Sequence, residues 1–105
     1  MKKYISIITT TSTKENAKSI TESILRSKLS PCVQQIPLIH STFIWKNKIQ
    51  YEDEVMLIIK AKQSNEKEIK NHIKKIHNYE IPEIISYEFD ILSQKYEKWF
   101  NDQQA

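Results

Sequence analysis

The stretch His77-Asn78-Tyr79-Glu80-Ile81-Pro82-Glu83-Ile84-Ile85 lies where a predicted helix ends and the last predicted strand begins. Pro82 favours extended geometry at the residue before it, and a strand-like run over residues 83–91 follows. Asn78 is expected to end the helix in a left-handed conformation. The stretch therefore orders helix, junction and strand, and it gathers an imidazole, a phenol and carboxylates at a junction, where rigid scaffolds usually present binding residues.

The chain before this junction begins with a predicted strand and helix. Residues 3–10 are rich in isoleucine and threonine, as in a buried strand, and residues 12–15 have the spacing of a capping box. A helix is expected from there to Leu29, and Pro31 prevents its continuation. Its core-facing residues recur at intervals of three and four and are Ala17, Ile20, Ile24 and Leu25.

A long hairpin is predicted next, with arms at residues 32–45 and 50–62 joined through residues 46–48. Because the chain contains no glycine, turns that need a positive φ are expected to use Asn or Asp, and Asn47 fits the hairpin turn. Pro37 predicts an edge strand or a bend in the first arm. Residues 55–59 are apolar on both alternating faces, which indicates a central strand covered on both sides.

A second helix over residues 65–77 and a short final helix capped by Ser93 complete the pattern. The order is β-α-β-β-α-β plus a terminal helix, which predicts an α+β, ferredoxin-like sandwich with both main helices on one face of an antiparallel sheet. The length of 105 residues suits one domain spanning residues 1–105.

The hairpin is longer than the helices that could cover it. An arm of thirteen residues reaches ~40 Å, whereas a helix of about twelve residues covers ~18 Å. Apolar residues occur at the hairpin tip and on the sheet face opposite the helices, so a partner surface is expected. The alternative is a coiled hairpin that wraps its own helices.

Composition excludes several classes of function. The chain has 16 basic and 13 acidic residues, and this dispersed excess of +3 gives little support for nucleic-acid binding. The first apolar run breaks at residues 9–12, too soon for a membrane span or a secretory core. Cys32 is the single cysteine and cannot form an internal disulfide, so a reducing compartment, the cytoplasm, is expected.

Several stretches, taken in order and spacing, resemble the CutA divalent-cation-tolerance family. They are Pro31-Cys32-Val33, Trp45-Lys46-Asn47-Lys48-Ile49, Glu54 to Lys60, the junction quoted above, and Tyr96-Glu97-Lys98-Trp99. The resemblance implies a homotrimer similar in arrangement to PII signalling proteins, with sheets facing the centre. Some family members carry a cysteine near the end of the first strand as a proposed copper ligand, and this chain has Ile7-Ile8-Thr9-Thr10 there.

The candidate site residues follow from this reading. His77 is the best candidate ligand for copper or zinc, against the alternative that it favours the helix C-terminal dipole. His72 lies five residues earlier and diverges from it. Six further residues are candidates for lining a ligand-binding cleft. The alternative for each is a structural role, in the core or in contacts between subunits. They are Cys32, Trp45, Glu54, Lys60, Tyr79 and Glu83.

No enzyme signature is present. Serine-nucleophile motifs, metallohydrolase histidine spacing and phosphate-binding glycine loops are absent, and Arg26 lies too late in its helix for an acylphosphatase cradle. The resemblance, together with this absence, therefore implies a non-catalytic trimer that binds a divalent metal and is associated with tolerance of metal ions, with no organic cofactor. The alternative is a PII-like sensor or protein-partner scaffold whose intersubunit clefts take a small, for example anionic, ligand.

Overall fold

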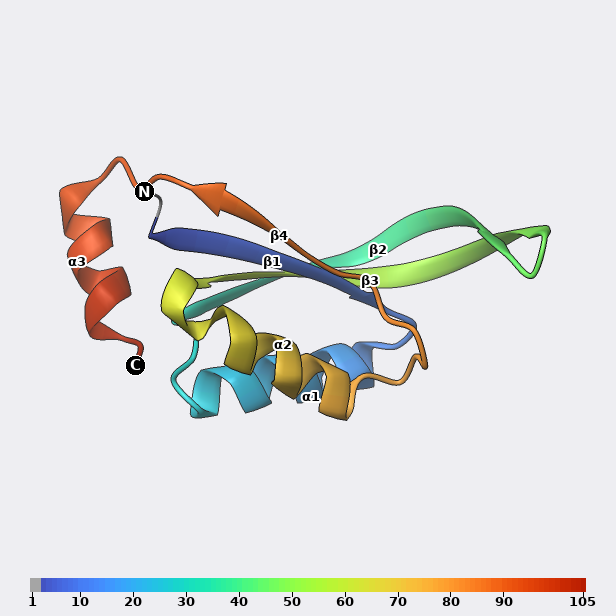
Figure 1. Cartoon of the computed structure of the whole chain (residues 1–105), viewed down its shortest axis with the longest axis horizontal. Coiled ribbons are helices and arrows are strands. Elements are labelled where there is room, and N and C mark those ends of the chain that lie inside the picture. The colour runs from blue at the N-terminus through green and yellow to red at the C-terminus, as the bar shows by residue number, and fades with distance from the viewer. Residues whose placement is uncertain (1–2) are drawn as a thin grey trace.

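The computed structural model describes residues 3–105, which form one four-stranded sheet and three α-helices (Figure 1). All strand pairs are antiparallel, and the sheet order is β2-β3-β1-β4. The elements are β1 (Tyr4–Thr11), α1 (Lys14–Arg26), β2 (Cys32–Trp45), β3 (Lys48–Lys62), the 3-10 helix η1 (Gln63–Asn65), α2 (Glu66–Ile76), β4 (Ile84–Phe89) and α3 (Gln94–Asp102). The predicted ferredoxin-like fold is confirmed, and each predicted element is present within a few residues of its expected bounds.

The core lies between the sheet and the layer formed by α1 and α2. Alternate residues of β1 and β3 point into it, and the helices contribute their apolar stripes. The fully buried members are Ile5, Ile7, Ala17, Ile20, Ile24, Leu57, Ile59, Ala61, Ile69 and Ile73. Leu25 was predicted to face the core but is 40% exposed, because its position on α1 lies outside the buried stripe.

The β2–β3 hairpin extends far beyond the rest of the sheet. The ladder between β1 and β3 ends at the pair Thr11–Val55, whereas the ladder between β2 and β3 continues to Trp45–Lys48. The longest dimension of the molecule, 46 Å, follows the hairpin, which projects away from the helices (Figure 1). The alternative of a hairpin wrapped around its own helices is therefore wrong.

Two irregularities shape this hairpin. Its two-residue turn uses Lys46 and Asn47, both at positive φ, as a type I′ turn requires. Between Ile36 and Ile39 the register shifts, so that two residues of β2 face one of β3. Pro37 lies in this bulge on an edge strand, where its missing N–H removes no ladder bond, as predicted.

The helix boundaries differ in detail from the sequence prediction. Thr13, not Ser12, caps α1, since its hydroxyl accepts from the Asn16 amide at 3.0 Å. The expected capping box is therefore wrong by one residue. At the other end, α1 stops at Arg26 rather than Leu29, and Ser93 caps α3 as predicted.

The left-handed positions also differ. Asn78 was expected at positive φ, but α2 ends with His77 in an extended conformation and Asn78 is not among the positive-φ residues. Lys28, at φ 57°, takes the left-handed position after α1, and the Leu29 amide there donates to the Ile24 carbonyl at 3.2 Å. The expectation that Asn or Asp would fill such positions is therefore wrong for Lys28 and Lys46.

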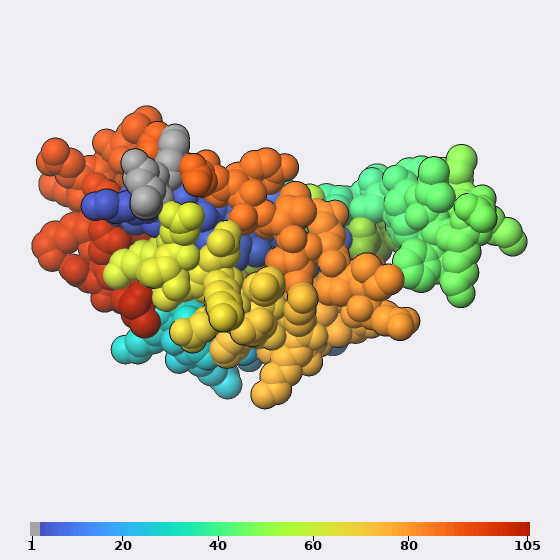
Figure 2. Space-filling view, in the orientation of Figure 1, coloured from blue at the N-terminus to red at the C-terminus, as the bar shows by residue number. Residues whose placement is uncertain are grey.

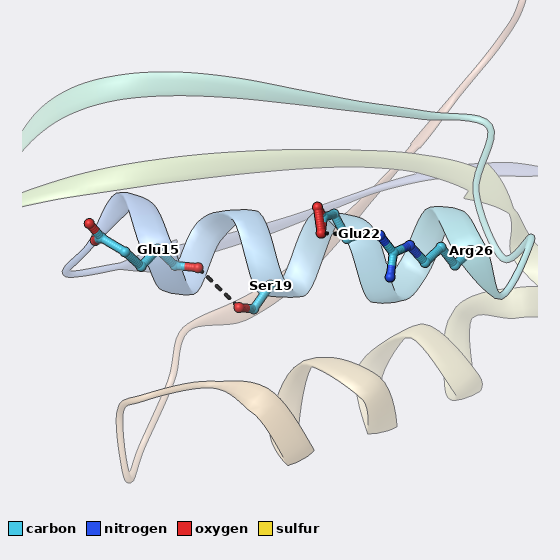
Figure 3. A network of polar contacts seen from close by, with 4 residues as sticks. All are labelled: Glu15, Ser19, Glu22 and Arg26. Atoms are coloured by element: carbon cyan, nitrogen blue, oxygen red, sulfur yellow. Dashed lines mark hydrogen bonds and ion pairs between the residues drawn. The ribbon is translucent and has the colours of Figure 1, made fainter.

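The outer surface of α1 carries ordinary polar contacts (Figure 3). The Ser19 hydroxyl donates to the Glu15 carbonyl at 3.1 Å, and Arg26 lies 3.5 Å from Glu22. An exposed ion pair four residues apart, such as Glu22–Arg26, contributes about 0.3–0.5 kcal/mol. Among the residues that the structure describes, no helix is long and apolar enough to cross a membrane.

Replacing Lys28 with glycine should stabilise the fold. A non-glycine residue in the left-handed region costs about 1–2 kcal/mol, and the extra chain entropy of glycine offsets only part of that gain. We expect Lys28→Gly to raise the Tm by a few degrees in thermal unfolding at fixed protein concentration.

Ser27→Gly is the matched control, because Ser27 has φ −81°, which any residue adopts. This variant should lower the Tm through chain entropy alone. Equal effects of the two substitutions would contradict the assignment of backbone strain to Lys28.

Candidate functional site

A groove of about 800 Å³ opens where the hairpin leaves the body of the molecule. One wall comes from the hairpin and the other from residues 78–83, which follow α2, and the space-filling view shows these two parts beside each other (Figure 2). The groove is lined by Thr10, Ser12, Ser41, Thr42, Phe43, Trp45, Gln50, Glu52, Glu54, Asn78, Tyr79, Glu80, Ile81 and Glu83. A groove of this size can hold a small organic molecule.

Strand alternation explains the hairpin wall. Glu52 and Glu54 are two residues apart on β3, so their side chains leave the same face of the ladder. Phe43 pairs with Gln50 and Trp45 is two residues further along β2, so both rings lie on that same face. The hairpin thus offers carboxylates near its base and aromatic rings near its tip.

The charge of the groove has one sign. Among residues 3–105, its lining contains the four carboxylates of Glu52, Glu54, Glu80 and Glu83 and no lysine, arginine or histidine. Neighbouring like charges in a concave site reinforce one another's field. The groove therefore attracts cations and repels anions.

Glu54 is the most enclosed of these carboxylates, with only 6% of the residue exposed. It accepts one hydrogen bond, from the Tyr79 hydroxyl at 2.7 Å, and no positively charged side chain among the described residues pairs with it. Burial, followed by this hydrogen bond and the charge of Glu54, raises the pKa of Tyr79 far above its ordinary value of 10.0. Tyr79 therefore remains a neutral hydrogen-bond donor to Glu54.

His77 has partners at both ring nitrogens. Nε2 lies 2.8 Å from the Thr10 carbonyl oxygen, and because a carbonyl can only accept, Nε2 carries the proton. Nδ1 accepts from the Tyr79 amide at 3.0 Å. Burial lowers the pKa of His77 below its ordinary value, and this outweighs the hydrogen bond to Thr10 and the charge of Glu54. The imidazole is thus held neutral and has no free lone pair for a metal ion.

Polar side chains fasten the junction to the body. The side-chain Nδ2 of Asn78 donates to the Ser12 hydroxyl at 2.8 Å, and its side-chain Oδ1 accepts from the Thr11 hydroxyl at 3.0 Å. Asn16 donates to the Ile76 carbonyl at 3.1 Å. Asn78 therefore serves this junction through its side chain rather than through the left-handed backbone that the sequence suggested.

The predicted cleft residues separate into two groups. Trp45, Glu54, Tyr79 and Glu83 line the groove together. Lys60 lies on the same sheet face as Glu54 but six residues away, or ~20 Å along the strand, and lines a second hollow of about 450 Å³ with Ser6 and Tyr96.

Cys32 lies next to Lys60, because the two residues are paired across β2 and β3. The thiol is partly buried and contributes, after desolvation, to a raised pKa of Tyr96. Within one chain the six residues therefore lie in two separate places, and the predicted intersubunit cleft, like the alternative of an interface ion pair between Glu54 and Lys60, stays a prediction.

Sequence reasoning missed some groove residues. Glu52 was not singled out, although its spacing of two residues from Glu54 on a predicted strand would have placed both on one face. Glu80 lies in the junction sequence, but no role was predicted for it. Nothing in the sequence marks Thr10 and Ser12 as groove residues, because their position in the groove depends on where β1 ends.

The described part of the chain contains no metal site made of three or more ligands from one chain. Within residues 3–105, no three histidine, cysteine, aspartate or glutamate side chains lie close enough together to hold one metal ion. His72 bonds to Ser23 at 2.9 Å and His40 lies 2.6 Å from Asp53, both away from the groove. A tight transition-metal site needs three or four converging ligands.

Comparison with known proteins agrees with the fold. Residues 5–103 match the family described as CutA1 divalent ion tolerance protein. The chain belongs to this family. The chloroplastic CutA protein of Arabidopsis thaliana is 34% identical over 98 residues, which cover 93% of this chain and 54% of that protein. This chain spans about half the length of several of the curated CutA relatives that it matches.

Solved CutA1 structures share the whole architecture. The crystal structure of CutA1 from Oryza sativa superimposes with a TM-score of 0.94 at 32% identity and covers 98% of this chain and 94% of that one. CutA1 from Ehrlichia chaffeensis gives 0.91 at 31% identity and covers 100% and 98%. The long hairpin and the terminal helix therefore belong to the CutA fold.

The neutral state of His77 predicts a pH dependence of stability. In the unfolded chain histidine titrates near 6.5, and the pKa of folded His77 is lower. Below pH ~6.5 the unfolded chain binds a proton that folded His77 does not, so the free energy of unfolding should fall until the pH reaches the lower folded value.

NMR titration of the imidazole carbon-bound protons tests this directly. The midpoint of His77 should lie below 6.5, and His77→Gln should flatten the loss of stability in this pH range. His72→Gln, on α2 away from the groove, is the control and should leave the His77 midpoint unchanged. A His77 midpoint at or above the unfolded value would contradict the conclusion that burial keeps this imidazole neutral.

Proposed function

We propose that this CutA-family protein is a non-catalytic homotrimer that binds cations in the acidic groove of each subunit. The observation that carries the proposal is the Glu54 carboxylate, which is almost fully buried, accepts one hydrogen bond and pairs with no positively charged group among the described residues. A charge in such a site is costly unless it is paired. A bound cation would provide the missing partner.

Divalent metal ions are the first cations to consider, because the family is named for tolerance to them. Hard ions such as Mn²⁺ or Mg²⁺ bind through one or two carboxylates and keep several waters, so they do not need three converging side chains. Copper or zinc at His77 stays a prediction: the ion would have to displace either the Thr10 carbonyl or the Tyr79 amide from the imidazole.

The sheet face opposite the helices supports the proposed trimer. Apolar side chains there form a continuous surface across all four strands, with Ile85 41% and Tyr87 59% exposed in the single chain. Burying large apolar side chains contributes roughly 1.5–3 kcal/mol each. The surface consists of Ile8, Ile36, Met56, Ile58, Ile85 and Tyr87.

A PII-like sensor or partner scaffold remains the second candidate function. The groove has the volume for an organic ligand, and its aromatic wall would serve such a ligand better than a metal ion. The acidic groove would repel a small anionic ligand, and among the described residues the second hollow has one lysine, Lys60, and one aspartate, Asp90, in its lining. The cytoplasmic location stays a prediction, and the Arabidopsis relative is named as a chloroplast protein.

The trimer should depend on the exposed sheet face. Light scattering at micromolar concentration should give three times the 12.5 kDa chain mass. Ile85→Asp should dissociate the assembly, because it places a charge in the proposed apolar interface.

Leu25→Asp is the matched control, since Leu25 is 40% exposed but lies on α1 in the opposite layer. It should leave the mass unchanged. A monomeric wild-type protein, or equal dissociation by both variants, would overturn the proposed interface.

Cation binding should depend on Glu54. Calorimetric titration with Mn²⁺, Cu²⁺ and Zn²⁺ should show saturable binding, and Glu54→Gln should weaken the favoured ion about tenfold or more, which corresponds to at least 1.4 kcal/mol. His77→Ala tests the imidazole separately: a loss as large as that of Glu54→Gln would make His77 a ligand.

Glu68→Gln removes the same charge from the exposed surface of α2 and is the control. It should leave binding unchanged, apart from a small general effect of net charge that salt suppresses. Equal losses in Glu54→Gln and Glu68→Gln would show that ions bind only to the overall charge, and the groove would lose its proposed role.

A further inference from the structure

We infer that the preferred ligand of the acidic groove is a linear aliphatic polyamine, a chain of methylene groups that carries two or more ammonium groups. This inference rests on the proposed cation-binding function and names its ligand class. It starts from a disagreement between the site and the family name: the groove has four carboxylates, yet they are not arranged around one point.

The spacing of the carboxylates suits separated charges. Glu52 and Glu54 leave the same strand face two residues apart, which puts their Cα atoms ~7 Å from each other. Glu80 and Glu83 belong to the opposite wall, formed by residues 78–83. A metal ion with oxygen ligands at ~2.0–2.6 Å draws its ligands to one centre. Ammonium groups joined by methylene chains can instead meet carboxylates that lie along a groove.

The uncharged part of the lining suits the rest of such a molecule. Phe43 and Trp45 are 40% and 44% exposed on the hairpin wall, and Ile81 is 70% exposed on the other. Methylene segments can pack against these surfaces, and ammonium groups next to the aromatic rings gain a cation–π attraction of about 0.5–1 kcal/mol. A hydrated metal ion gains nothing from an apolar wall.

The polar lining fits as well. An ammonium group has three N–H donors and no acceptor, so it needs oxygen acceptors beyond the carboxylate that neutralises it. The groove offers side-chain oxygens from Thr10, Ser12, Ser41, Thr42 and Gln50, and no lysine or arginine of the described chain lines the groove to compete for them. Glu54 is the anchor for one ammonium group, because it is the most enclosed carboxylate and has no positively charged partner in the described chain.

Calorimetric titration of the intact protein with spermidine tests the inference. We expect saturable binding of one spermidine per chain, weaker binding of putrescine, which carries one ammonium group fewer, and no binding of the uncharged analogue 1,4-butanediol. The double variant Glu52→Gln/Glu54→Gln should weaken spermidine binding at least tenfold. Glu15→Gln/Glu68→Gln removes the same charge from the exposed helix surfaces and should have little effect.

A second pair of variants tests the aromatic wall. Trp45→Ala should weaken spermidine binding several-fold, while Trp99→Ala, on α3 and similarly exposed at 43%, should not. Light scattering and circular dichroism on each variant confirm that fold and mass are retained, and the glutamine variants, which keep side-chain size, test the inference even where Trp45→Ala fails to fold.

The possible results separate the two claims. Mn²⁺ binding that depends on Glu54, without spermidine binding, would overturn the polyamine inference and leave the cation-binding proposal intact. Spermidine binding that is equally weakened by both double variants would show attraction to net charge only and would overturn the inference too. If neither ligand binds, both claims fail. Spermidine binding lost only in Glu52→Gln/Glu54→Gln and Trp45→Ala supports the inference.

Discussion

The difference in length between neighbouring strands is the constraint on which the rest of the structure depends. β3 has 15 residues and pairs with β1 over only eight of them, so its remaining half can pair with β2 alone. In the part of the chain that the structure describes, no helix covers this half and β2 is its only neighbouring strand (Figure 1). This half forms one wall of the groove, and the end of β1 at Thr11 marks the point where the groove begins.

The same constraint explains why Glu54 is enclosed. On β3, Glu54 is the first residue beyond the β1 ladder, and the chain that returns from α2 covers this position with Tyr79. The polar bonds of Asn78 to Ser12 and Thr11 hold that covering segment against the end of β1. Glu54 is buried because the junction covers position 54. The fold itself does not require a charged side chain at this position.

Sequence alone predicted the fold well, because strand and helix periodicities are local signals. Residues 55–59 indicated a central strand, Pro37 an edge, and Asn47 the turn, and all three are confirmed. The site was harder to predict, since it depends on where ladders stop rather than on what a segment is. Glu54 and Lys60 were placed correctly on one face, but only the registers show that they serve different hollows.

The unpaired carboxylate is an argument about function rather than about stability. A glutamine at position 54 could accept the Tyr79 hydrogen bond without the desolvation cost of a charge, so stability alone would favour the neutral side chain. Departures of this kind from local stability rules are expected at functional sites. Three more carboxylates line the same groove, and each repels Glu54 and raises that cost. A cation in the groove would attract Glu54 and the three other carboxylates and so offset both the repulsion among them and the desolvation of Glu54. The lack of a positively charged partner for Glu54 in the described chain is therefore our main reason for proposing a cationic ligand.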